Sequence, residues 1–333
     1  MRPCLASVAV AVALAQAAPA AGQTTLKIAT LAPEGSAWMR LFHAWKDKVE
    51  ARTDGRVKVR FYAGGAQGDE RDVLRKIRLG QLAGGAVTGI GLSSISPEAR
   101  ALEIARTDEQ LDGLRAALDA DIRRRLEEKG WILVGWGDVG PVHLFSRRPV
   151  KTLDDLRGTK LWLWSDDPIS RELFAALGVH GVPLGVPEVL PGLATGQIDA
   201  FFGSPLSTLA LQWGAHARAM SAITVSQATG ATVLAKKVWD ALAPADRQIL
   251  AEEAAVMQAQ VLRQVRADND KALAALQAQG MVVVAPSPEL ARALDEASEA
   301  IARAHAGDVG KAFADKVQKL VDDYRAGAPG RSR

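Results

Sequence analysis

Residues 244–279 read PADRQILAEEAAVMQAQVLRQVRADNDKALAALQAQ and predict one uninterrupted helix. Pro244 suits the first turn of a helix, and Gly280 suits its end. At ~1.5 Å per residue such a helix is on the order of 50 Å long, which exceeds the diameter of a small domain. We therefore expect this helix to brace two lobes of the protein.

Strands and helices alternate along the rest of the chain. Alternating or continuously apolar runs, as at residues 57–62 and 131–134, predict strands, whereas residues 111–126 have the spacing of an amphipathic helix. Alternation of this kind favours α/β lobes with mostly parallel sheets. The length of 333 residues fits one large domain or two of medium size.

The amino terminus predicts export to the periplasm. Arg2 is followed by an apolar, alanine-rich stretch and then by small residues, which is the pattern of a secretory signal peptide over residues 1–22, cleaved near residues 20–23. The apolar stretch is shorter than the roughly 20 residues that cross a bilayer. Cys4, the only cysteine, lies inside this segment, so we expect the exported chain to contain no thiol or disulfide.

Composition excludes several classes of function. The chain has 41 Lys plus Arg against 38 Asp plus Glu and no basic run interleaved with aromatic residues, so we expect no nucleic acid partner. Hydrophobic residues make up 48%, which excludes disorder as the main state. No phosphate-binding glycine loop, nucleophile elbow or metal-ligand spacing of histidines is present in the sequence. We therefore expect no enzyme activity, cofactor or metal.

Several strings of the sequence occur in a characteristic order. They are GRVKV at residues 55–59, QGDER at 67–71, LGQL at 79–82, RPVKTLDDLRGTKL at 148–161, PEV at 187–189 and LATGQID at 193–199. Through them the chain resembles, from about Thr25 to Lys319, the DctP-type substrate-binding proteins of tripartite ATP-independent periplasmic (TRAP) transporters.

The resemblance implies a two-lobed α/β solute-binding-protein fold with hinge strands and a long helix spanning both lobes. A small-molecule ligand would be held in the cleft between the lobes and delivered to TRAP-type permease subunits in the membrane. We expect residues 23–147 plus about 228–268 to form lobe I, and residues 148–227 plus about 269–325 to form lobe II. Residues 326–333 would be a flexible tail.

The chain departs from the family at the expected ligand site. Trp162 stands where the resemblance places an arginine that grips the ligand carboxylate, and Ser204 stands near the place of an asparagine. Another position that is often basic holds Val142, beside His143. Burying a carboxylate without a paired cation costs several kcal/mol. We therefore expect the ligand to be largely apolar or uncharged.

The aromatic residues near strand ends, together with polar residues near helix starts, are the candidates for ligand binding. Trp162 has the strongest case, whereas Trp164 and Phe201 suit the core equally well, and Glu70 also suits a helix cap. The candidate residues are Trp38, Glu70, Thr88, Trp136, His143, Trp162, Trp164, Phe201 and Ser204.

Three alternatives stay open at this point. The protein could bind an ordinary organic acid through a substitute cation, for which Lys160, Arg147 and Arg171 are the candidates. It could instead be an envelope component that binds a lipid or a protein, with a helical-repeat protein as partner. An exported enzyme is the last alternative, and the inventory of residues does not favour it.

Overall fold

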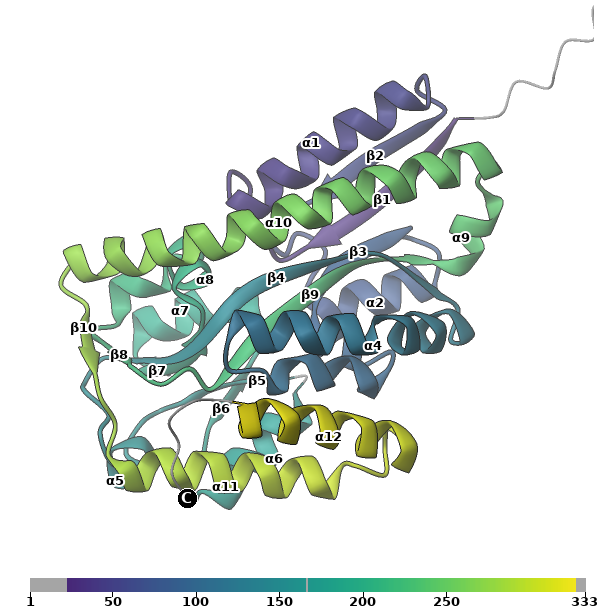
Figure 1. Ribbon diagram of the computed structural model, residues 1–333. Helices are drawn as coiled ribbons and strands as arrows, with labels where there is room; N and C mark the ends of the chain where they lie inside the picture. The colour runs from purple at the N-terminus through teal and green to yellow at the C-terminus, as the bar shows by residue number, and fades with distance from the viewer. Residues whose placement is uncertain (1–22, 166, 328–333) are drawn as a thin grey trace, which may run out of the picture.

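The computed structural model describes residues 23–165 and 167–327. The expected signal peptide at residues 1–22 and residues 328–333 of the expected tail lie outside these ranges, while residues 326 and 327 belong to the last helix. Figure 1 shows two lobes connected by long strands, with one long helix lying along both. The expected α/β fold is confirmed.

Lobe I is a sheet with helices on both faces. Its own strands run parallel to one another, with β1 between β2 and β3. These strands are β1 (Thr24–Thr30), β2 (Val57–Tyr62) and β3 (Gly84–Thr88). The helices that precede the hinge strands are α1 (Ala37–Arg52), α2 (Glu70–Arg78), α3 (Gly89–Ser93), η1 (Pro97–Ile104) and α4 (Asp108–Glu128).

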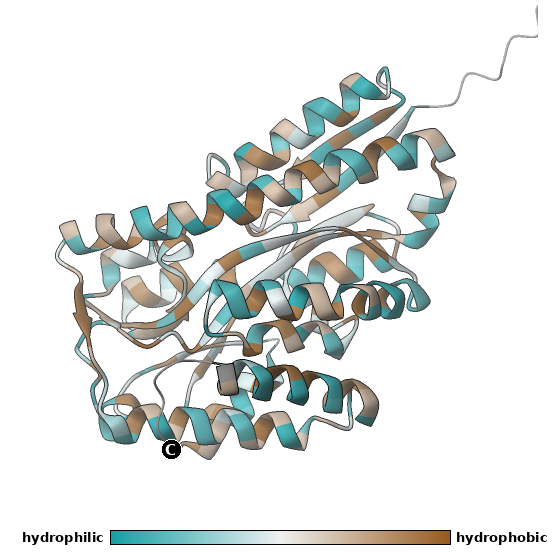
Figure 2. Cartoon of the chain, viewed as in Figure 1, coloured by the Kyte–Doolittle hydropathy of each residue, from teal (hydrophilic) through white to brown (hydrophobic). Residues whose placement is uncertain are grey.

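Two apolar layers hold lobe I together. On one face of the sheet, α1 packs with Phe42 and Trp45 in a cluster that also contains Met257 of the long helix. On the other face, α2 and α4 pack with Leu74 and Leu118 among buried residues of the central strands. Figure 2 shows these helices banded in hydrophilic and hydrophobic colours, as expected of amphipathic helices that cover a sheet.

Strands β4 (Trp131–Ser146) and β9 (Ser226–Ala235) run through both lobes. They pair antiparallel from Trp131 opposite Ala235 to Val142 opposite Ser226, and β9 also pairs with β3. The end of β4 pairs with β7 and β8 of lobe II. The expectation of mostly parallel sheets is therefore wrong, because the strands that join the lobes pair antiparallel and make the sheet mixed.

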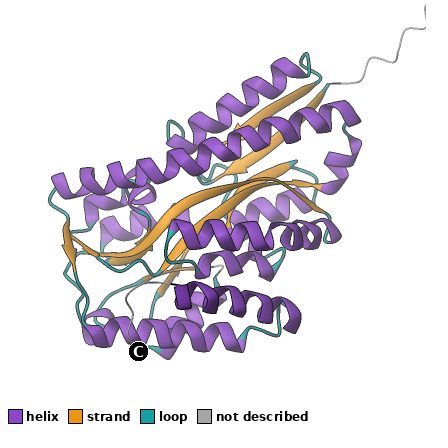
Figure 3. Ribbon diagram, viewed as in Figure 1, coloured by secondary structure: helices purple, strands orange, loops and turns teal. Residues whose placement is uncertain are grey.

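Lobe II is built around shorter elements. Its strands are β5 (Trp162–Trp164), β6 (Val182–Leu184), β7 (Ala200–Gly203), β8 (Ala219–Ser221) and β10 (Val282–Val284). Its helices are α5 (Leu153–Arg157), α6 (Pro168–Ala176), α7 (Val186–Thr195), α8 (Pro205–Ala210), η2 (Trp213–His216) and α11 (Pro288–Ala304). Figure 3 shows these short strands beside the helices, with β10 at the outer edge of the lobe.

The long helix α10 (Pro244–Ala278) follows the short helix α9 (Lys236–Ala241) and confirms the expected brace. It packs on β4, on α1 of lobe I and on α8 of lobe II. The buried Asn269 links it to α8 and β4: its Oδ1 accepts from the backbone N–H of Leu206 at 3.0 Å, and its Nδ2 donates to the carbonyl of Val139 at 3.0 Å.

None of the helices within the described ranges is long and apolar enough to cross a membrane.

The last helix, α12 (Lys311–Gly327), returns to lobe I. Phe313 and Val317 are buried in the cluster beneath α4, and Lys316 pairs with Asp121 of α4 at 2.8 Å. The expected boundary assigned this segment to lobe II. The structure departs from that expectation because the apolar face of α12 is buried against α4.

We predict that Asn269→Ala lowers the free energy of unfolding by about 1–3 kcal/mol, because Leu206 N–H and the Val139 carbonyl lose a buried partner. Urea denaturation measures this change. Gln264→Ala, at an exposed amide on the same helix, is the control and should change stability by less than about 0.5 kcal/mol. Equal effects of the two substitutions would contradict the role given to Asn269.

Candidate ligand site between the lobes

The carboxylate of Asp69 connects the two lobes. Asp69 caps α2, and its Oδ1 accepts from the backbone N–H of Glu70 at 2.7 Å. Its Oδ2 accepts from Trp164 Nε1 and from the backbone N–H of Val186, each at 2.9 Å. Trp164 ends β5 and Val186 begins α7, so both donors belong to lobe II. The lobes are thus held together at this point by hydrogen bonds to a charged acceptor, which are stronger than neutral ones.

Arg100 of η1 forms a second contact between the lobes. Its guanidinium binds both carboxylate oxygens of Asp167, at 2.9 and 3.2 Å, and its Nε lies 2.9 Å from Glu103 Oε2. Asp167 caps α6 through Ser170. Burial by itself would raise the pKa of Asp167, but the charge of Arg100 and hydrogen bonds from Arg100 and Ser170 hold this pKa below its ordinary value.

Glu70 and Thr88, both predicted site residues, lie together. The buried Glu70 carboxylate accepts from the backbone N–H and hydroxyl of Thr88, at 2.7 and 2.9 Å, and from the backbone N–H of Gly91 at 2.9 Å. A Cβ at Gly91 would lie 2.4 Å from Glu70 Oε2, so α3 needs glycine at this position. Burial raises the pKa of Glu70 to about 8 despite these hydrogen bonds.

Two predicted tryptophans lie within lobe I. Trp38, half-buried, donates from Nε1 to the carbonyl of Asp138 on β4 at 2.9 Å. Trp136 is buried and donates from Nε1 to Asp119 of α4 at 2.5 Å. Trp136 therefore belongs to the core beneath α4, because that face of β4 is covered by the helix. The structure thus contradicts its expected place in the cleft.

Trp162 and Phe201 lie in the core of lobe II. Trp162 is only 7% exposed, its Nε1 donates to the Leu184 carbonyl at 3.0 Å, and its ring packs edge-on against Trp213 with centroids 5.2 Å apart. Phe201 also packs against Trp213 and is fully buried. Both rings therefore pack against Trp213, whereas we had expected them to contact a ligand. Trp164 continues the series from Trp162 toward lobe I, with ring centroids 6.0 Å apart.

His143 and Ser204 have local roles in lobe II. Nδ1 of the buried His143 donates to the carbonyls of Ser221 and Ile223, at 3.0 and 3.1 Å, and burial lowers its pKa. Ser204 is fully buried and caps α8 by accepting from the backbone N–H of Ser207 at 3.1 Å. Both side chains are used within the fold, so the structure does not support their expected contact with a ligand.

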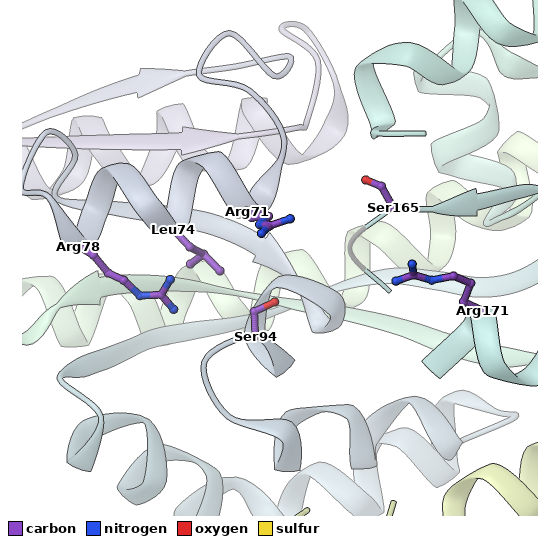
Figure 4. A pocket seen from close by; sticks show the side chains of 6 residues that line it. All are labelled: Arg71, Leu74, Arg78, Ser94, Ser165 and Arg171. Carbon is purple, nitrogen blue, oxygen red and sulfur yellow. The ribbon is translucent and has the colours of Figure 1, made fainter. Parts of the chain in front are cut away.

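A basic pocket of about 290 Å³ lies where the two lobes face each other (Figure 4). Lobe I contributes three residues of α2 and one that follows α3, and lobe II contributes one residue after β5 and one of α6. The lining residues are Arg71, Leu74, Arg78, Ser94, Ser165 and Arg171.

Arg171 was a candidate substitute cation in the sequence, and the structure places it in this pocket. The other two candidates lie elsewhere: Lys160 Nζ donates to the Gly196 carbonyl at 3.0 Å, and Arg147 donates to the Leu193 carbonyl. Sequence reasoning missed Arg71 and Arg78. Their spacing of seven residues, which puts both on one face of a helix, was the available signal.

Within the described ranges, no group of three or more His, Cys, Asp or Glu side chains is placed to hold a metal ion.

Residues 28–308 match the DctP family model, described as bacterial extracellular solute-binding protein, family 7. The chain belongs to this family. A curated relative from Verminephrobacter eiseniae, named solute-binding protein, is 28% identical over 275 residues, which cover 80% of this chain and 81% of the relative.

Solved structures of the family share the fold of this chain. The extracytoplasmic solute receptor DctP7 of Bordetella pertussis, which binds pyroglutamic acid, has a TM-score of 0.82 at 21% identity and covers 91% of this chain and 99% of its own. A TRAP solute-binding protein of Desulfovibrio desulfuricans with bound sn-glycerol-3-phosphate has a TM-score of 0.82 at 22% identity, with 93% and 99% covered. The two-lobed architecture of TRAP solute-binding proteins is therefore confirmed.

We predict that Trp164→Phe opens the lobes, because it removes the hydrogen bond that Trp164 Nε1 of lobe II donates to Asp69 of lobe I. A lost hydrogen bond to a charged group is worth about 1.5–3 kcal/mol, enough to change the ratio of closed to open molecules roughly tenfold or more. Small-angle X-ray scattering measures the change as a larger radius of gyration. Trp162→Phe, which loses a bond within lobe II, is the control, and an equal change in both variants would refute the prediction.

We predict that the free energy of unfolding falls as the pH rises from about 4.5 through about 8, in part because of Glu70. The raised pKa means that folded Glu70 binds a proton that the unfolded chain releases above about 4.5, so raising the pH favours unfolding. Glu70→Gln should flatten the decline between pH 5 and pH 9 by roughly a few kcal/mol.

Urea denaturation at several pH values measures this difference. Glu296→Gln, at an exposed carboxylate of α11, is the control and should leave the decline unchanged. A decline of wild-type size in Glu70→Gln would show that another group is responsible.

Proposed function

We propose that this protein is the periplasmic solute receptor of a TRAP-type importer, and that it captures a small organic acid between its lobes and delivers it to the permease subunits. Family membership supports the transport role. The observation that carries the choice of ligand is the pocket lined by Arg71, Arg78 and Arg171, to which both lobes contribute. Arginine matches carboxylate and phosphate groups in geometry and charge.

The acid replaces the apolar ligand that the sequence led us to expect. That expectation rested on Trp162 facing the cleft, and Trp162 is buried against Trp213 and Leu184 within lobe II. The substitute cation Arg171 lies in the pocket instead. The acids bound by the two related structures support the same choice. A lipid-binding role with a helical-repeat partner depended on the same apolar cleft and has no other support.

Export follows from the same proposal. A receptor that serves a membrane permease works outside the cytoplasm, and the sequence of residues 1–22 supplies the expected signal peptide. A ligand held between two lobes binds the closed state in preference to the open one, so it shifts the population toward closure. The permease would then receive the closed, loaded receptor.

We predict that an organic acid stabilises the purified protein against heat, and that uncharged apolar compounds do not. At a ligand concentration one hundred times the Kd, the stabilisation should be about 2.7 kcal/mol. Thermal unfolding with a panel of sugar acids, dicarboxylates, pyroglutamate and sn-glycerol-3-phosphate, against medium-chain alcohols, measures it. Native mass spectrometry of the protein as purified would identify a ligand retained from the cell. Stabilisation by the alcohols alone would overturn the acid proposal.

A further inference from the structure

We infer that His305 is a pH-dependent clamp, which holds the turn between α11 and α12 on helix α6 in acid and releases that turn as the pH rises. The turn consists of residues 305–310, which follow α11 and precede α12. This inference concerns a movement built into the fold and holds whatever the identity of the ligand.

The turn lies on a connection between the lobes. Helix α11 packs on α6 of lobe II, whereas α12 packs on α4 of lobe I. His305 directly follows α11, and its backbone N–H donates to the carbonyl of Ile301 at 3.0 Å, which ends that helix. The imidazole therefore lies where the chain leaves lobe II for lobe I.

The imidazole of His305 bridges two carboxylates from different elements. Its Nε2 lies 2.9 Å from Glu172 Oε2 of α6, and its Nδ1 lies 2.7 Å from Asp308 Oδ2 of the turn. A neutral imidazole has one N–H and one lone pair, whereas an ionised carboxylate only accepts hydrogen bonds. Both contacts are therefore made together only by the protonated ring, which donates from both nitrogens.

Loss of the proton breaks one side of this bridge. One ring nitrogen then turns a lone pair toward a negatively charged oxygen, and that contact becomes repulsive. Loss of the Glu172 contact frees the turn from α6, and loss of the Asp308 contact frees the turn from the end of α11. Because 53% and 59% of these two acidic side chains are exposed, water can replace either contact, and the clamp is a modest, reversible restraint.

The direction of the pH effect follows from the charges around the ring. Glu172 and then Asp308 raise the pKa of His305 above its ordinary value of 6.5, and partial burial opposes them only in part. A raised pKa in the clamped state means that the clamp is fully formed below about pH 6.5 and is lost as the pH rises through that raised pKa. Acid therefore strengthens the clamp.

Other charged side chains near this turn have partners or places of their own. Among the described residues they are Arg303, which pairs with Glu299 of α11 at 3.7 Å, Lys311, which pairs with Asp315 of α12 at 3.0 Å, and Arg171 of α6, which lines the basic pocket. Glu172 and Asp308 are thus the charges that decide the protonation of His305.

Nuclear magnetic resonance titration of the histidine Cε1–Hε1 signals between pH 5 and pH 9 tests the bridge in the full-length exported protein. His305→Gln assigns the signal by removing it. We expect the pKa of His305 to lie above 6.5 and to fall by about half a unit in Glu172→Gln. Glu296→Gln, at an exposed carboxylate of α11, is the matched control and should leave this pKa unchanged. A wild-type value at or below 6.5, or no change in Glu172→Gln, would overturn the inference.

Hydrogen exchange of residues 305–310, divided by the intrinsic exchange rate at each pH, tests the release. The backbone N–H of Asp308 donates to the His305 carbonyl at 3.0 Å and reports the order of the turn. A pKa raised by half a unit makes the clamp about threefold weaker for the neutral ring. We therefore expect protection in wild type to fall roughly threefold between pH 5.5 and pH 8.5.

Two histidine variants separate titration of His305 from other effects of pH. Protection of the turn should no longer depend on pH in His305→Gln, whereas His180→Gln, at an exposed histidine of lobe II, should keep the wild-type fall. Circular dichroism should show both variants folded. A fall of wild-type size in His305→Gln would assign the effect to another group and overturn the clamp.

Discussion

The two lobes share β4 and β9, and this sharing constrains the rest of the structure. Strand β4 runs from lobe I into lobe II and the antiparallel β9 runs back, so neither lobe has a complete sheet without the other. The long helix α10 covers the same junction. Relative movement is therefore confined to places where the ladder is irregular. One such place is Gly140, where the register shifts and φ is +115°, a conformation that glycine tolerates and other residues rarely adopt.

Contacts between the lobes are polar where they close on each other. Asp69 and Arg100 of lobe I meet Trp164 and Asp167 of lobe II through directional hydrogen bonds, whereas the apolar clusters lie mainly within one lobe. Polar contacts of this kind exchange readily with water, so separating the lobes does not expose a large hydrophobic surface. Because the contacts between the lobes are polar and the apolar clusters lie mainly within each lobe, the lobes can open and close without unfolding. The closed arrangement then selects among solutes by charge and shape.

The fold could be predicted from the sequence in large part because its elements have clear local signals. Pro244 and Gly280 bounded the long helix, and the amphipathic spacing of residues 111–126 predicted part of α4. The site was less accessible to prediction. Trp162 has the same local pattern whether it faces a ligand or a core, and its partner Trp213 lies far away in the sequence. Arg71 and Arg171 become neighbours only when the two lobes are placed together, which no local pattern encodes.

The carboxyl-terminal helices add a fourth crossing between the lobes. Helix α11 is anchored on lobe II through the buried Leu290, and α12 is anchored on lobe I through Phe313, with only residues 305–310 between them. A chain of about six residues spans roughly 20 Å when fully extended. This short tether limits how far the outer surfaces of the lobes can swing apart. The range of lobe opening is thus limited by the short segment between α11 and α12 as well as by the flexibility of the shared strands.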